Sequence, residues 1–290
     1  MRIDQLLVQK GLANTRSQAQ RLIADGVEWA QGETWRRIVK NGDDVPESAE
    51  LRLLDDSEAR YVSRGGLKLE AALKKVGLSV EGFACLDVGQ STGGFTDCLL
   101  QAGAKSVVGV DVGSAQLHPM LRSDPRVLCV EKVNARALTA EDLIQAYEDS
   151  TGEEGQFDVE DDENDEGDEG DEASGVSDAV PTESEFVPAF DLIVADLSFI
   201  SQTLVLPAVV PLLKAGGTLL TLVKPQFELQ PGQVGKGGIV KDPEFYVVVE
   251  QRLREACAAL GLTVTAWFDS PIAGGDGNRE FFICATKLAE

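Results

Sequence analysis

Four charged residues stand out because they lie in apolar or glycine-rich surroundings. They are two lysines and two carboxylates: Lys68, Asp196, Lys224 and Glu280. A lysine that is partly removed from water and lies beside another cation has its pKa lowered toward neutrality. More of it is then the neutral amine, which can take a proton from a ribose hydroxyl. We interpret the four residues as a candidate catalytic group that the fold must bring together. The alternative is that they form two ordinary salt bridges.

A second motif, at residues 86–97, reads LDVGQSTGGFTD. Its glycines would let the backbone approach a nucleoside-type ligand at a strand-to-helix turn. It lacks the Gly-Lys-Ser/Thr of a phosphate-binding loop and does not match the Gly-x-Gly-x-x-Gly of dinucleotide sites. A carboxylate two positions before the first glycine, as in Asp87 and Gly89, is typical of S-adenosylmethionine sites, where it helps to hold the methionine ammonium group.

Asp111 lies about 20 residues beyond the glycine turn, where a carboxylate can bind the ribose hydroxyls of a nucleoside. Together the turn and Asp111 predict S-adenosyl-L-methionine as the cofactor. The residues that we expect to bind it are Asp87, Gly89, Ser91, Gly93, Gly94, Phe95, Asp111, Asn134 and Asp196.

The second part of the chain alternates apolar strand-like runs with helical segments, which predicts an α/β fold with a doubly wound parallel sheet. Strands are predicted at residues 84–88, 106–112, 127–130, 192–195 and 218–223, with a closing hairpin at 264–268 and 281–285. Four candidate residues lie at the ends of these strands: Gly89, Asp111, Asp196 and Lys224. In such a sheet ligands bind at the carboxyl ends of the strands, so these residues should meet at one edge.

Residues 1–60 predict a compact α+β domain. Apolar residues at helical spacing near the start are followed by a second helix that Asn14 or Thr15 can cap and that ends at Gly26. Short strands are predicted at 27–29, 35–39 and 51–54. The arginines that we expect to face RNA are Arg2, Arg16, Arg21, Arg36 and Arg37. The alternative is that these arginines form a solvated surface.

The net charge of −23 is unusual for an RNA-binding protein, which should be basic. However, residues 148–185 hold 18 Asp and Glu and no Lys or Arg, so the remainder carries only −5. Residues 1–40 have 7 basic and 4 acidic side chains. The acidic insertion cannot bury apolar surface, and we predict that 148–185 is disordered. It is interpreted as a tolerated surface insertion; an RNA mimic or a protein-docking segment is the alternative.

Metal, disulfide and membrane functions find little support in the sequence. The five cysteines are odd in number and form no Cys-x-x-Cys pair, so we expect reduced thiols and no metal. The single histidine, His118, is interpreted as structural or exposed. A signal-peptide pattern is absent, and no apolar run reaches the ~18 residues of a membrane helix. We therefore expect a cytoplasmic protein without a membrane partner.

The N-terminal pattern resembles the S-four (S4) RNA-binding domain, through residues 2–7, 11–13, 15–17 and 22–27. It departs from that domain after Gly26, where residues 28–32 replace the usual short Val-Asn-Gly turn. Nearly the whole chain, except the acidic insertion, resembles the TlyA family through residues 63–69, 87–97, 196–201, 224–228, 237–241 and 270–281. Small departures are Gln90, where alanine is more usual, and Ser114-Ala115.

The resemblance implies an S4 domain at residues 1–60 and an FtsJ-like methyltransferase domain at 61–290. It also implies methylation of ribose 2′-hydroxyls in ribosomal RNA or ribosomal subunits, and a Lys-Asp-Lys-Glu catalytic group that the four charged residues match. One alternative is a ribosome assembly factor that binds RNA without catalysis. Another is a cytolysin, because some family members carry the historical label hemolysin. The absent signal peptide, the absent basic amphipathic helix and the negative charge argue against a cytolysin.

Overall fold

The structure is a computed structural model that describes residues 1–13, 15–32, 34–54, 60–152, 186–272 and 277–288. Its N-terminal part contains two helices followed by a three-stranded antiparallel sheet of order β2-β1-β3. The elements are α1 (Ile3–Gln9), α2 (Arg16–Gly26), β1 (Val27–Gln31), β2 (Thr34–Arg37) and β3 (Leu51–Leu53). The apolar faces of both helices form one small core that includes Ile3, Leu7 and Leu22. The predicted α+β unit is therefore present.

The start of α2 follows the predicted capping pattern. Thr15 is the cap, and its Oγ1 accepts a hydrogen bond from the backbone N–H of Gln18 at 3.1 Å. Asn14, the other predicted cap, lies outside the described residues. Strand β2 ends at Arg37, so the predicted strand at 35–39 extends two residues too far. Ile38 turns inward and is buried instead, with its N–H bonded to the carbonyl of Val27.

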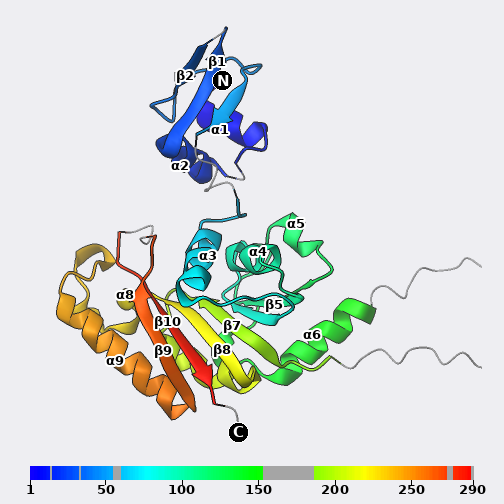
Figure 1. The fold of residues 1–290 in the computed structure, drawn as a ribbon, viewed down its shortest axis with the longest axis vertical. Helices are drawn as coiled ribbons and strands as arrows, with labels where there is room; N and C mark the ends of the chain where they lie inside the picture. The colour runs from blue at the N-terminus through cyan, green and yellow to red at the C-terminus, as the bar shows by residue number, and fades with distance from the viewer. Residues whose placement is uncertain (14, 33, 55–59, 153–185, 273–276, 289–290) are drawn as a thin grey trace, which may run out of the picture.

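The second part of the chain is built on a seven-stranded sheet of order β6-β5-β4-β7-β8-β10-β9 (Figure 1). The strands are β4 (Ala84–Val88), β5 (Ser106–Asp111), β6 (Val127–Glu131), β7 (Phe190–Asp196), β8 (Leu213–Val223), β9 (Leu262–Asp269) and β10 (Phe281–Lys287). The five neighbouring strands β6, β5, β4, β7 and β8 pair in parallel, and β10 is antiparallel to both β8 and β9. The predicted parallel sheet and closing hairpin are confirmed.

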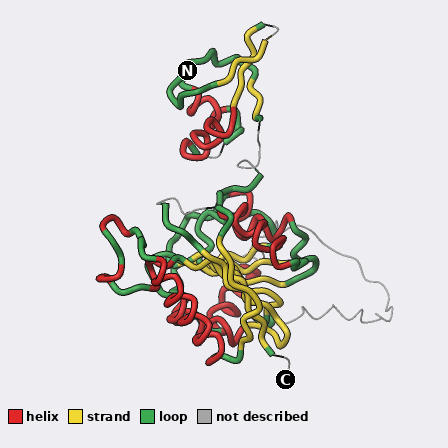
Figure 2. The backbone as a smooth tube through the Cα atoms, turned by 60° about the vertical axis from the view of Figure 1, so that its left-hand side comes forward, coloured by secondary structure: helices red, strands yellow, loops and turns green. Residues whose placement is uncertain are grey.

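Helices cover both faces of this sheet (Figures 1 and 2). They are α3 (Gly65–Val76), α4 (Gly94–Gln101), α5 (Pro119–Arg122), α6 (Ala140–Gly152), α7 (Gln202–Val209), α8 (Pro225–Glu228) and α9 (Pro243–Ala259). Helices α3, α4 and α5 pack on the face that carries Cys85, and α6, α7 and α9 pack on the opposite face with Leu86. Successive residues of a strand point to opposite faces, so one short apolar run supplies both cores. No helix in the described part is long and apolar enough to span a membrane.

The predicted disorder of the acidic insertion is wrong at its first residues. Residues 148–152 form the last turns of α6, which ends at Gly152. The helix continues because its apolar side still finds partners: Leu143 is fully buried, and the ring of Tyr147 stacks on Phe186 with centroids 4.7 Å apart. Composition alone does not show such a partner across an insertion. The remaining residues, 153–185, lie outside the described part of the chain.

Candidate active site

The register of the sheet brings the candidate charges into one row. Val88 pairs with Val110 on one side and with Ala195 on the other. Asp196 pairs with Leu222, and Phe281 pairs with Val223. Each of these pairs contains or lies next to a residue of the predicted site. The site residues at this level of the sheet are Gly89, Asp111, Asp196, Lys224 and, just before β10, Glu280. The row lies at the carboxyl edge of the parallel strands, where the strand order reverses between β4 and β7.

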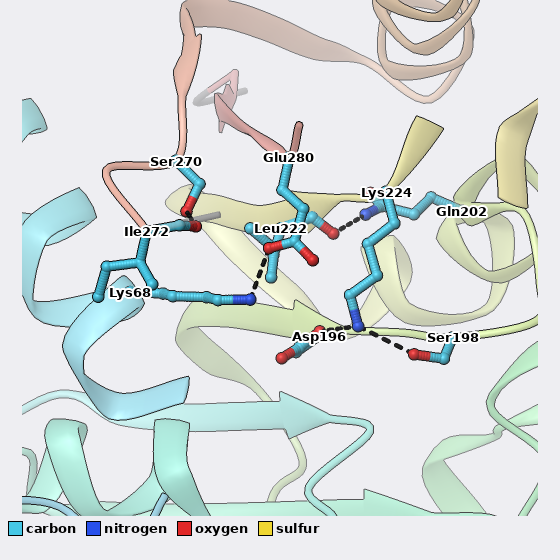
Figure 3. A network of polar contacts seen from close by, with 9 residues as sticks. All are labelled: Lys68, Asp196, Ser198, Gln202, Leu222, Lys224, Ser270, Ile272 and Glu280. Carbon is cyan, nitrogen blue, oxygen red and sulfur yellow. Dashed lines mark hydrogen bonds and ion pairs between the residues drawn. The ribbon is translucent and has the colours of Figure 1, made fainter. Parts of the chain in front are cut away.

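The four charged residues form two ion pairs (Figure 3). Lys68, in the first turn of α3, places its Nζ 2.5 Å from Oε2 of Glu280, although 212 positions separate them in the chain. Lys224 places its Nζ 2.6 Å from Oδ1 of Asp196 and donates to Oγ of Ser198 at 2.9 Å. The strand ends that carry Asp196, Lys224 and Glu280 lie side by side, so the fold does bring the predicted group together. The two salt bridges of the alternative interpretation are present in the same arrangement.

A cleft opens beside one of these pairs. Its lining residues are Ser63, Gly65, Gly89, Gln90, Ser91, Thr92, Gly94, Phe95, Asp196, Ser198 and Lys224. Lys68 and Glu280 do not line it, and their side chains are only 10% and 4% exposed. The Lys224–Asp196 pair therefore meets the space that a ligand can enter, and the Lys68–Glu280 pair lies behind it. Of the predicted cofactor-binding residues, five line the cleft: Gly89, Ser91, Gly94, Phe95 and Asp196.

The glycines of the turn after β4 are required by close contacts within the protein. Gly89 has a φ of +85°, and a Cβ there would lie 2.9 Å from the carbonyl oxygen of Asp196. A Cβ on Gly94 would lie 2.1 Å from Oγ of Ser63. Gly93, with φ +94°, faces Leu121 and does not line the cleft. The turn therefore packs tightly against the end of β7 and the start of α3, beside the cleft that Asp196 and Lys224 line.

Asp87 is fully buried beneath the cleft. Its Oδ2 accepts a hydrogen bond from Thr96 Oγ1 at 2.7 Å, and Thr96 Oγ1 in turn accepts from Nε2 of Gln90 at 2.9 Å. Burial raises the pKa of Asp87 to about 7. Its Oδ1 has no hydrogen-bond partner among the described residues. Gln90 fills the space above Gly109, where a Cβ would lie 1.9 Å from its amide.

Asp111 fastens two loops at the end of β5. Its carboxylate accepts the N–H of Ser91 at 2.8 Å and the N–H of Gly113 at 2.7 Å. It therefore holds the glycine turn in place and keeps lone pairs for a ligand. Asn134 is exposed after β6 and caps a short 3₁₀ helix by accepting the N–H of Arg136 at 3.1 Å. Neither residue is among those that line the cleft, and their cofactor contacts stay predictions.

Two aromatic residues at the rim of the site were not singled out from the sequence. Phe199 is 90% exposed, has a φ of +66°, and lies 4.9 Å from the ring of Phe227. A left-handed conformation is unusual for a bulky residue and marks a constrained position. A signal was available, because each phenylalanine follows a candidate catalytic residue, Asp196 or Lys224, by three positions.

A buried carboxylate joins the two segments that carry the open pair. Glu228 accepts a hydrogen bond from Ser201 Oγ at 2.5 Å and from the N–H of Gln202 at 2.8 Å. Burial raises its pKa above the usual value. The bonds tie α8, which follows Lys224 directly, to the loop that follows Asp196. The sequence analysis did not predict these hydrogen bonds, because nothing in the sequence around Glu228 indicates that it is buried.

The predicted RNA-facing arginines occupy different environments. Arg2 and Arg16 both bond to the carboxylate of Asp4. Arg21 donates to the carbonyl of Ser17 at 3.3 Å on the surface of α2. Arg36 and Arg37 lie exposed on β2, an outer strand of the small sheet. The structure therefore keeps all five guanidinium groups at or near the surface of the N-terminal domain, and their contacts with RNA stay predictions.

Comparison with known proteins supports both parts of this description. Residues 61–287 match the model of the FtsJ-like methyltransferase family, and residues 1–26 match the S4 domain. The chain is 38% identical to the 16S/23S rRNA (cytidine-2′-O)-methyltransferase TlyA of Mycobacterium tuberculosis, over 97% of this chain and 88% of that one. It is 34% identical to Hemolysin A of Brachyspira hyodysenteriae, over 97% and 98%.

A solved structure is also similar over the full length. It is a protein described as a hemolysin from Streptococcus thermophilus, with 36% identity and a TM-score of 0.65, and the match covers 99% of this chain and 88% of that chain. The family match extends over the sheet, the glycine turn and both ion pairs. This chain belongs to the FtsJ-like methyltransferase family, and it is an S-adenosylmethionine-dependent methyltransferase that carries an S4 domain at residues 1–26.

Proposed function

We propose that this protein methylates ribose 2′-hydroxyl groups of ribosomal RNA. The observation that carries the proposal is the Lys224–Asp196 pair, which lies at the cleft beside the glycine turn. The relatives named for cytidine 2′-O-methylation of ribosomal RNA support the substrate. Action on ribosomal RNA would place the activity in the cytoplasm.

Two carboxylates next to the residues that line the cleft fit the cofactor. S-adenosylmethionine carries an ammonium group, a ribose and an electrophilic methyl group on a sulfonium, which is the group to be transferred. Asp87 offers a buried carboxylate oxygen without a hydrogen-bond partner, which an ammonium group would satisfy directly or through a water molecule. Asp111 offers the remaining lone pairs of a carboxylate that Ser91 and Gly113 already orient. We therefore assign the amino-acid end to Asp87 and the ribose to Asp111.

In the proposed reaction, Lys224 acts as a neutral amine that orients the ribose 2′-hydroxyl and takes its proton, becoming an ammonium group. Asp196 and Ser198 fix the direction of Lys224 Nζ, at 2.6 Å and 2.9 Å. Lys68 and Glu280 hold the start of α3 against β10 and contribute fixed charges behind the site. Catalysis would then arise from orientation and from electrostatic stabilisation of charge that develops on the hydroxyl oxygen.

The rim of the cleft is suited to a base that has left its helical stack. Sequence-specific enzymes often bind unstacked bases of RNA against aromatic side chains. Phe199 presents its ring to solvent next to Ser198, and Phe227 supports it from the side. We infer that this pair receives the base of the target nucleotide while its ribose lies at Lys224.

The test is a methyl-transfer assay with S-adenosylmethionine that is radiolabelled in the methyl group, on ribosomal subunits from a strain that lacks this gene. We expect label in RNA, and we expect the modified linkage to resist alkaline hydrolysis, because a 2′-O-methyl group removes the nucleophile for strand cleavage. Label on a base, or cofactor binding without any transfer to RNA, would contradict the proposal. The second outcome would favour the assembly factor that binds RNA without catalysis.

A further inference from the structure

The N-terminal domain contains a buried carboxylate between two arginines. Asp4, in the first turn of α1, is 0% exposed. Arg2 donates to it through two nitrogens, with Nε 3.1 Å from Oδ1 and Nη2 3.0 Å from Oδ2. Arg16, at the start of α2, donates through Nη2 to the same Oδ2 at 2.8 Å. One carboxylate therefore fixes two guanidinium groups from two different helices side by side.

The arrangement leaves a surplus of positive charge at the surface. The side chains of Arg2 and Arg16 are 46% and 54% exposed, whereas the carboxylate between them is closed off from solvent. Each guanidinium has five N–H donors, and only two from Arg2 and one from Arg16 bond to Asp4. The arginines hold the pKa of Asp4 well below its usual range, so the three groups carry a net charge of about +1 at any physiological pH.

We propose that Asp4 is a positioning residue that holds Arg2 and Arg16 as one clamp for a backbone phosphate of RNA. A single arginine would be enough to neutralise a buried carboxylate, so the second one is free to serve a ligand with its outward donors. Guanidinium groups of fixed orientation bind phosphate better than mobile ones, because less side-chain entropy is lost. Asp4 itself is covered by its surroundings, including the two arginines, and has no exposed surface with which to contact RNA. This inference rests on the proposed function of the chain.

The proposal can be tested because it predicts the opposite change in RNA affinity from the one that charge alone predicts. Asp4→Asn removes a negative charge, so simple electrostatics predicts tighter binding of RNA. If Asp4 positions the arginines, the same change weakens binding, because the amide carries no negative charge and its NH₂ group cannot accept the bond from Arg2 Nε, so both guanidinium groups are held less firmly. The matched control is Glu47→Gln, which removes a negative charge from an exposed residue of the same domain.

The measurement is filter binding of labelled 23S ribosomal RNA to the full chain over a series of salt concentrations. We expect Asp4→Asn to raise the dissociation constant about five- to tenfold, and Glu47→Gln to change it less than about twofold. The salt dependence should separate the two as well. Each lost phosphate contact flattens the slope of log K against log salt by roughly 0.7–0.9, and the control should keep the slope. A purely structural role of Asp4 would not change this slope.

Binding by Asp4→Asn that equals or exceeds that of the parent chain would overturn the proposal. If Asp4→Asn melts the N-terminal domain in thermal unfolding, Arg16→Lys decides the question, since it keeps the charge and loses the oriented guanidinium. We expect Arg16→Lys to bind as weakly as Arg16→Ala, and parent-like binding would refute the clamp. Failure of the parent chain itself to bind ribosomal RNA would instead contradict the proposed function.

Discussion

The two lysine–carboxylate pairs at the edge of the sheet have the same chemistry and different access to solvent. Both join their charged atoms at about 2.5 Å, but the Lys68–Glu280 side chains are 10% and 4% exposed, and those of Lys224 and Asp196 are 14% and 25% exposed. Only the second pair lines the cleft. We propose that burial divides the four charged residues into a closed, supporting pair, Lys68–Glu280, and an open, reacting pair, Lys224–Asp196.

The largest effect should come from the open pair. We expect Lys224→Ala to lower the single-turnover rate of methyl transfer on the order of 10²–10⁴, the usual contribution of a positioned general base. Cofactor affinity, measured by calorimetry, should remain close to that of the parent chain, because the role that we propose for Lys224 is in the chemical step. Lys224→Arg should also fail, since a guanidinium does not give up its proton. Near-normal turnover of the Arg variant at neutral pH would show that Lys224 acts only as a charge.

The closed pair should matter most for stability. Removing one partner, as in Lys68→Met, leaves Glu280 as an uncompensated buried charge and should cost about 3–5 kcal/mol of the free energy of unfolding. The double variant Lys68→Met with Glu280→Gln should recover part of that loss. The matched change Lys224→Met should cost less, because the side chain of its partner Asp196 is 25% exposed, although the Oδ1 atom that meets Lys224 is buried. Equal losses in urea unfolding would contradict the division into a buried and an open pair.

Asp87 extends the comparison to a buried carboxylate that has no ion-pair partner within the described part of the chain. Burial raises its pKa to about 7 in the folded chain, against 3.8 as the ordinary value. The folded state then binds more protons than the unfolded state between about pH 4 and pH 7, so stability falls as pH rises through this range. The loss should be on the order of 2–4 kcal/mol, and Asp87→Asn should remove it. Urea unfolding of both chains at pH 5 and pH 8 measures the difference, and identical pH dependence would contradict the assignment.

Most of the residues at the carboxyl edge of the sheet could be predicted from the sequence, because the sequence indicates where the strands end. Gly89, Asp111, Asp196 and Lys224 each follow or end an apolar run, and parallel strands bring such residues to one edge. Glu280 is different, since it precedes β10 and reaches the edge only because that strand runs antiparallel to β8. Its pairing with Lys68 was not predicted, because the spacing of the four charged residues does not show which of them meet.

Three features could not be predicted, for a shared physical reason. Asp4 and Glu228 are polar residues at helical positions that usually face water, and their burial depends on partners elsewhere in the fold. Phe199 adopts a left-handed conformation that its residue type disfavours, so local preferences point away from it. Each depends on tertiary contacts that no local pattern in the chain records. The predicted start of disorder at residue 148 was wrong for the same reason, because α6 continues to Gly152 and its Tyr147 contacts Phe186.

The smallest expected effect concerns Asp111, a partly exposed carboxylate that is held by backbone N–H groups and not by a cation. Asp111→Ala should weaken S-adenosylmethionine binding by about 1–3 kcal/mol in calorimetry, because both the ligand contacts and the order of the glycine turn are lost. Asp111→Asn keeps the shape and one acceptor, so it should lose less than the alanine variant. Turnover at saturating cofactor should stay near that of the parent chain in both variants, since Lys224 and Asp196 are untouched. A rate that falls at saturation while affinity is preserved would move Asp111 from cofactor binding to the reacting pair.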